Sequence, residues 1–90
     1  MTFNPAPTDL SGKRCFVTGA NGGIGASAAE HFAALGAQVF TTDLGDRFEG
    51  NCQSEHCGLN LLSDQGLTDC KSWIADMKPD VIFNNAAIFD

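Results

Sequence analysis

The sequence predicts an α/β fold built on a doubly wound parallel sheet, and two observations support this prediction. Four short apolar segments are separated by connecting segments, which favours parallel strands joined by right-handed crossovers. The first of these segments runs into a glycine-rich turn and a helical pattern, an order typical of phosphate-binding turns. With 90 residues the chain holds at most one domain, and a complete doubly wound fold needs more. We therefore expect a partial sheet of about four strands.

The first strand, turn and helix are expected between residues 15 and 36. Residues 1–8 contain two prolines and little periodicity, which predicts a flexible N-terminal arm, so the domain is expected to span residues 9–90. Residues 15–17 form the apolar strand, a helix runs from Ala26 onward, and Gly36 ends it as a left-handed cap. The stripe expected in the core consists of Ile24, Ala28, Phe32 and Leu35, with small Ala26, Ala29 and Ala33 allowing close approach to the sheet.

The remaining three strands and one helix follow the same reasoning. Residues 38–42 form the second strand, the polar segment 44–56 is expected to hold a short crossover helix or none, and residues 57–61 form the third strand. Ser63 or Asp64 caps the next helix, which stops at Lys78-Pro79, and the fourth strand lies within 80–87. The apolar stripe of this helix is Leu67, Cys70, Ile74 and Met77, and Trp73 beside it is expected to serve packing.

The glycines at 19, 23 and 25 predict a turn that approaches a ligand closely. A Cβ atom there would block either a positive φ angle or the approach of the backbone to the ligand. The following helix directs free N–H groups and the positive end of its dipole at this turn, which suits a pyrophosphate. Such a turn can also merely connect a strand to a helix. Asp43, which follows the second strand about 20 residues further on, favours a nucleotide because an acid at that place binds ribose hydroxyls.

Two motifs resemble a known family. Thr18-Gly19 followed by Gly23-Ile24-Gly25 departs from the general dinucleotide fingerprint and resembles the cofactor turn of classical short-chain dehydrogenases/reductases. Asn84-Asn85-Ala86-Ala87 resembles their Asn-Asn-Ala-Gly strand, with Ala87 replacing the glycine. The resemblance covers nearly all of the chain from Asp9. It implies a Rossmann-like sheet of strand order 3-2-1-4, with the cofactor over the strand ends where the first and fourth strands diverge.

The resemblance also implies a function and a set of site residues. It implies the NAD(P)-binding segment of an oxidoreductase that transfers a hydride between NAD and an alcohol or carbonyl substrate, within a homo-oligomeric parent enzyme. Asn60 stands where the family has an acid that holds the adenine, so it keeps an acceptor oxygen but loses the charge. The implied cofactor-binding residues are Gly19, Asn21, Gly22, Gly23, Ile24, Gly25, Asp43, Leu44, Asn60, Leu61, Asn85, Ala86 and Ala87. Asn84 and Asn85 could equally satisfy buried backbone groups at the strand end.

NAD is favoured over NADP as the cofactor. A 2′-phosphate beside the Asp43 carboxylate would face a like charge, at a cost of about 4 kcal/mol at ~4 Å and an effective dielectric of ~20. Gly22 and Leu44 stand where NADP-using relatives often carry basic residues, whereas Arg47 lies near enough to count against the preference. In the alternative interpretation, Asp43 only caps a turn.

No catalytic residue is identified in this chain. The family uses a downstream Ser and a Tyr-x-x-x-Lys pair, and this sequence contains no tyrosine. We therefore expect the catalytic C-terminal part to be absent and the chain alone to be inactive, with an uncovered edge at the last strand. One alternative is a stand-alone nucleotide-binding module or sensor without catalysis. A methyltransferase-type nucleotide site is a weaker one.

The composition argues against several classes of binding partner. The net charge of −6 comes without a basic cluster, which argues against nucleic acid and anionic membranes as partners. No apolar run is long enough to span a bilayer and no signal sequence is evident, so a cytoplasmic protein with reduced cysteines is expected. Cys52, Glu55, His56 and Cys57 could suggest zinc, but a second paired cluster is missing, which favours a polar loop and no metal site.

Overall fold

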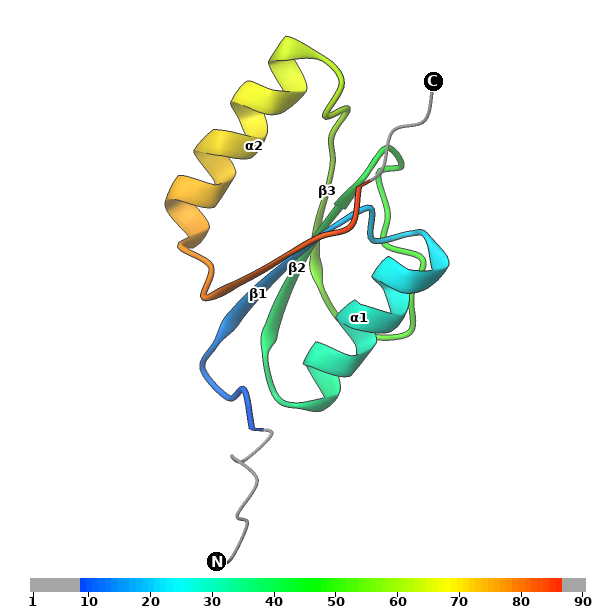
Figure 1. Cartoon of the computed structure of the whole chain (residues 1–90), viewed down its shortest axis with the longest axis vertical. Coiled ribbons are helices and arrows are strands. Elements are labelled where there is room, and N and C mark those ends of the chain that lie inside the picture. The colour runs from blue at the N-terminus through cyan, green and yellow to red at the C-terminus, as the bar shows by residue number, and fades with distance from the viewer. Residues whose placement is uncertain (1–8, 87–90) are drawn as a thin grey trace, which may run out of the picture.

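A computed structural model describes residues 9–86, which form a four-stranded parallel sheet with one helix on each face (Figure 1). The strand order is β3-β2-β1-β4, so the predicted α/β class, parallel sheet and strand order are confirmed. The expected flexible arm, residues 1–8, lies outside the described residues, as does Ala87. In chain order the elements are β1 (Arg14–Thr18), α1 (Gly23–Ala34), β2 (Gln38–Asp43), β3 (Glu55–Gly58), α2 (Asp64–Met77) and β4 (Val81–Asn84).

The core consists of two apolar clusters, one on each face of the sheet. Successive side chains of a strand point to opposite faces, and residues paired in register point to the same face. Phe16 pairs with Phe40, and both belong to the cluster that packs against α2. Trp73 of α2 contacts both rings edge-on, at centroid distances of 5.4 Å and 6.1 Å, so its predicted packing role is confirmed. The cluster on the α1 face contains Val17, Ala20, Ala29 and Val39.

The predicted apolar stripes of the helices were wrong in their first turns. The α1 helix begins at Gly23 rather than Ala26, and Ile24, which we expected in the core, is 70% exposed. Leu67 of α2 is likewise 44% exposed. Both residues lie in the first turn of their helix, which follows the carboxyl end of a strand. Glycine, alanine, cysteine and methionine are the buried residues of these helices instead: Gly25 and Ala29 in α1, and Gly66, Cys70 and Met77 in α2.

The third strand also differs from the prediction. It occupies Glu55–Gly58 instead of residues 57–61, because it pairs with β2 only until β2 ends at Asp43, which lies opposite Gly58. Residues 59–62 therefore form the connection to α2. The segment between β2 and β3 contains no helix, as expected. Gly36 has a φ of +94°, which confirms the predicted left-handed cap of α1. Within residues 9–86 no helix is long and apolar enough to cross a membrane.

Candidate nucleotide-binding site

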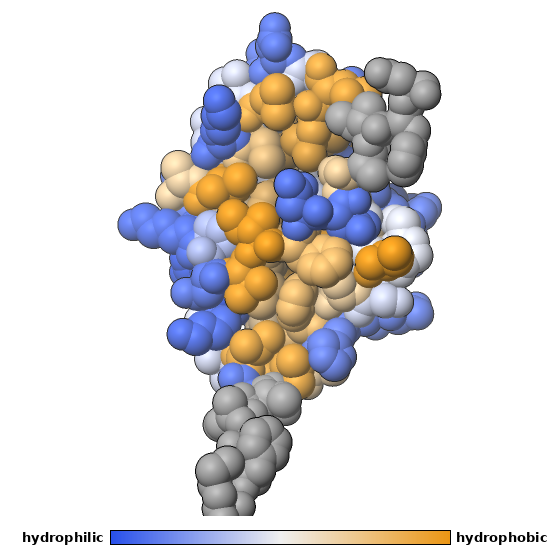
Figure 2. Space-filling view, viewed as in Figure 1, coloured by the Kyte–Doolittle hydropathy of each residue, from blue (hydrophilic) through white to orange (hydrophobic). Residues whose placement is uncertain are grey.

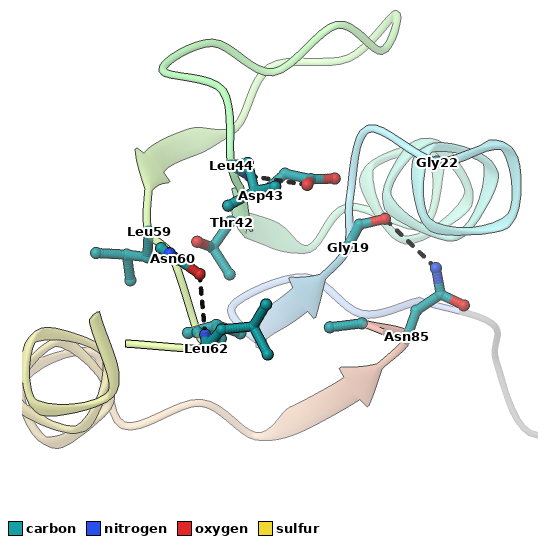
Figure 3. A pocket seen from close by; sticks show the side chains of 11 residues that line it. Gly19, Gly22, Thr42, Asp43, Leu44, Leu59, Asn60, Leu62 and Asn85 are labelled. Carbon is teal, nitrogen blue, oxygen red and sulfur yellow. Dashed lines mark hydrogen bonds between the residues drawn. The ribbon is translucent and has the colours of Figure 1, made fainter. Parts of the chain in front are cut away.

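A cavity of about 340 Å³ lies at the carboxyl ends of the strands (Figure 3). Parallel α/β sheets bind their ligands at this edge, where neighbouring strands connect to opposite faces. The cavity brings together predicted site residues from four segments of the chain, namely Gly19, Gly22, Asp43, Leu44, Asn60, Leu61, Asn85 and Ala86. It is also lined by Thr42, Leu59 and Leu62, which the sequence analysis missed although each lies beside a predicted residue.

The glycine turn is held by two close backbone approaches. Gly19 has a φ of +64°, and a Cβ atom there would lie 3.1 Å from backbone atoms of Asn85 and Ala86. A Cβ atom on Gly25 would lie 2.2 Å from the Gly19 carbonyl oxygen. These two positions therefore need glycine for the turn to pack between β4 and α1.

The N-terminus of α1 is left without a side-chain cap. Its N-cap residue, Gly22, makes no side-chain hydrogen bond, and its first turn contains no acidic residue. The α2 helix is different, because Ser63 accepts a hydrogen bond from the Gly66 amide and Asp64 lies in the first turn. Of the two helices in residues 9–86, α1 is therefore the one whose positive dipole end and first N–H groups lack a side-chain cap, and its N-cap residue lines the cavity.

Asp43 ends β2 with its carboxylate fixed at the cavity. One carboxylate oxygen accepts a hydrogen bond from the Asn21 backbone amide at 2.9 Å, and the other accepts one from the Leu44 amide at 2.8 Å. Each oxygen retains a further lone pair, since a carboxylate offers about four acceptor sites. The carboxylate is thus oriented and can still accept hydrogen bonds from ligand hydroxyls.

The ends of β1 and β4 are joined by a buried hydroxyl. Thr18 Oγ1 donates a hydrogen bond to Asn84 Oδ1 at 2.9 Å. Thr18 Oγ1 also accepts hydrogen bonds from the backbone amides of Asn85 and Ala86, each at 3.0 Å. Asn85 also donates from Nδ2 to the Gly19 carbonyl at 3.3 Å. The asparagines therefore satisfy polar groups at the strand end, and Asn85 also lines the cavity, while their contact with a cofactor stays a prediction.

Leucine side chains and the amide of Asn60 also line the cavity. Leu44 and Leu62 line the cavity and are 71% and 66% exposed, so both leave apolar surface uncovered beside it. Asn60 Oδ1 accepts a hydrogen bond from the Leu62 amide at 3.0 Å, which fixes the Asn60 side chain and leaves one lone pair free.

Several predicted residues lie elsewhere. Asn21, Gly23, Ile24 and Gly25 are not among the residues that line the cavity. The Asn21 side chain instead contacts the segment that follows β2, donating from Nδ2 to the Arg47 carbonyl and accepting at Oδ1 from the Glu49 amide. Ala87 falls outside the described residues.

In the segment that contains Cys52, Glu55, His56 and Cys57, both ring nitrogens of His56 are engaged in hydrogen bonds within the protein. The His56 ring lies 2.7 Å from Thr41 Oγ1 through Nδ1 and 2.8 Å from the Gly45 carbonyl through Nε2. Among residues 9–86 no group of three potential ligands could hold a metal ion. All four cysteines are free, and burial raises the pKa of Cys15, Cys52 and Cys70. A nearby carboxylate adds to the rise in pKa at Cys15 and Cys52, and the Cys57 thiol adds to it at Cys70.

Comparison with known sequences identifies dehydrogenase relatives, although no protein-family model matches the chain. The short-chain dehydrogenase/reductase dpfgG of Gibberella zeae is 31% identical over 90% of this chain and 34% of its own length. The short-chain dehydrogenase/reductase dpmpG of Macrophomina phaseolina is 32% identical over 92% of this chain and 54% of its own length. The chain thus spans between about a third and a half of these relatives.

Solved structures agree with the sequence relatives. A Beutenbergia cavernae protein crystallised with NADP at low occupancy matches with a TM-score of 0.79 and 29% identity, over 94% of this chain and 38% of that one. The hydroxysteroid dehydrogenase of Escherichia coli matches with a TM-score of 0.72 and 28% identity, over 94% of this chain and 41% of that one. The predicted resemblance and Rossmann-like fold are confirmed, and the alternative of a stand-alone sensor is not favoured.

Proposed function

We propose that this chain, which resembles the cofactor-binding part of short-chain dehydrogenases/reductases, binds NAD within an oxidoreductase that transfers a hydride between NAD and an alcohol or carbonyl substrate. One observation carries the proposal: an uncapped helix N-terminus, a fixed carboxylate and the Asn85 end of β4 meet at one cavity. When bound, the cofactor supplies the hydride acceptor or donor. The residues of this chain bind and orient it, and the proposal assigns none of them a catalytic role.

Each part of the cavity suits one part of the dinucleotide. The pyrophosphate fits over Gly22 at the start of α1, where the free N–H groups and the dipole favour negative charge. The adenosine ribose fits beside Asp43, and the adenine fits between the apolar side chains of Leu44 and Leu62. Asn85 then faces the nicotinamide half, because it lies on the other side of Gly19 from Asp43 (Figure 3), and Ala86, the next residue, also lines the cavity. A homo-oligomeric parent enzyme and a cytoplasmic location stay predictions.

The preference for NAD over NADP follows from the charge of Asp43. Its carboxylate would lie beside a 2′-phosphate, and a repulsion of about 4 kcal/mol at ~4 Å exceeds the ~1.4 kcal/mol that corresponds to tenfold in affinity. Solvent screening lowers this repulsion for NADP. NAD carries an uncharged 2′-hydroxyl at the same place and meets no such repulsion, so the preference keeps its direction.

Titration of the chain with NADH and NADPH, followed by nucleotide fluorescence, tests this proposal. The unmodified protein should bind NADH more tightly than NADPH. Asp43→Asn should raise the NADPH affinity relative to NADH by about tenfold, because it keeps the side-chain shape and removes the charge. Asp46→Asn, an exposed change three residues further on, is the matched control and should leave the ratio unchanged. Binding of neither nucleotide, or displacement of NADH by S-adenosylmethionine at lower concentration, would refute the proposal.

A further inference from the structure

The segment between β2 and β3 is tied down at regular intervals. We call residues 44–54 the strap, since they stand in place of a crossover helix and pack Phe48 and Cys52 against the cluster on the α1 face of the sheet. The Gly45 carbonyl contacts His56 of β3 at 2.8 Å, and the Asn51 amide donates to Glu30 of α1 at 2.8 Å. Between these two ties, the hydrogen bonds that join the strap to the rest of residues 9–86 all come from the glycine turn.

Asn21 supplies that central tie. Its side chain donates to the Arg47 carbonyl at 2.9 Å and accepts from the Glu49 amide at 2.8 Å, while its own amide donates to Asp43. One residue of the glycine turn therefore fixes both the ribose-site carboxylate and the middle of the strap. Asn21 was predicted to lie at the cofactor, but within residues 9–86 both hydrogen bonds of its side chain go to the strap.

The strap carries one basic residue, and that residue lies in a second cavity. Arg47 is the only lysine or arginine of residues 44–54. It lines a cavity of about 650 Å³ on the α1 face, together with Gln38, Phe48 and His56, and it does not line the cavity at the strand ends. Arg47 is four residues from Asp43, so its placement depends on how the strap is held.

We propose that Asn21 is a specificity-determining residue, which keeps Arg47 away from the ribose site and so preserves the preference for NAD. The inference rests on the proposed function. With the Asn21 side chain in place, a 2′-phosphate meets only the Asp43 carboxylate. Without it, the middle of the strap loses its hydrogen bonds to the glycine turn and is held by Phe48, which packs against the α1-face cluster. The Arg47 carbonyl is then no longer fixed, and the Arg47 guanidinium can approach a 2′-phosphate, which it binds far better than a hydroxyl.

A double-mutant cycle tests this inference in the full chain. Asn21→Ala should raise the NADPH affinity relative to NADH by about fivefold or more, since an opposite charge near the phosphate offsets part of the Asp43 repulsion. The double variant Asn21→Ala/Arg47→Ala should lose that gain, and Arg47→Ala alone should leave the ratio as it is. Glu30→Ala is the control for general loosening, because it releases the strap only at Asn51 and should not change the ratio.

Hydrogen exchange gives a readout that does not depend on the nucleotide. In Asn21→Ala the Glu49 amide loses its acceptor and should exchange about tenfold faster. An unchanged exchange rate of the Glu49 amide would show that Asn21 does not hold the strap. Faster exchange with an unchanged NADPH to NADH ratio would overturn the role in specificity and leave Asn21 a structural residue. If the unmodified chain binds neither nucleotide, the proposed function fails and the specificity role fails with it, while the exchange rates still decide whether Asn21 holds the strap.

Discussion

Replacing Gly25 with alanine should destabilise the protein, because the new methyl group would meet backbone rather than a movable side chain. The added Cβ atom would lie 2.2 Å from the Gly19 carbonyl oxygen and 2.9 Å from its carbon, whereas ordinary contacts begin at 3.4 Å. The α1 helix and the glycine turn would have to separate by about 1 Å, which we estimate at about 3 kcal/mol from overpacked cores. The better helix propensity of alanine returns about 1 kcal/mol, so a net loss of about 2 kcal/mol is expected.

Gly23→Ala is the matched control, since it makes the same chemical change two residues earlier in the same helix. A Cβ atom on Gly23 meets nothing within 4 Å, so this variant should be stabilised by about 0.5 kcal/mol. Urea unfolding followed by Trp73 fluorescence measures both free energies, and thermal melting should separate the two variants by about 10 °C or more. If Gly25→Ala proves as stable as Gly23→Ala, the contact between the turn and α1 is looser than the structure indicates and the steric reasoning is wrong.

Three further predictions concern a buried hydroxyl and the cysteine thiols. Thr18→Val should lower the free energy of unfolding by about 2–4 kcal/mol, because it leaves two backbone amides and Asn84 without their hydrogen-bond partner. Thr18→Ser keeps the hydroxyl and should lower the free energy of unfolding less. Equal losses in the two variants would show that the hydroxyl does not have this role. Because burial raises the pKa of the Cys15 and Cys70 thiols, these groups stay protonated to higher pH when folded, so stability should decline above about pH 8.5. An alkylating reagent at pH 8 should modify exposed Cys57 first, and mass spectrometry that found Cys15 modified equally fast would contradict its burial.

The fold was predictable because its main signals are local. Apolar segments of strand length, a glycine turn and a cap such as Ser63 each depend on a few neighbouring residues, and the structure places them as expected. The boundaries of β3 were not predictable in this way. They depend on where β2 ends, because a strand continues only while a partner offers hydrogen bonds.

The helix faces show a second limit of local patterns. Helical spacing correctly grouped apolar residues in α1 and α2, yet it assigned Ile24 and Leu67 to the core. Periodicity defines a direction around the helix axis but not how far the sheet extends along it. Exposure at a helix end therefore depends on the packing of the whole domain.

The sequence was enough to predict the residues of the candidate site. The glycines and Asn85 each follow a strand, Asp43 ends one, and parallel strands end at one edge of their sheet. Which of these residues line the cavity depends on how the elements pack. The tertiary structure removed Asn21 from the cavity and made it the tie of the strap, and it placed Arg47 in a different cavity from Asp43. The physical reason is that hydrogen bonds between Asn21 and residues 26 and 28 positions away depend on how the chain closes in space, and no local pattern encodes that closure.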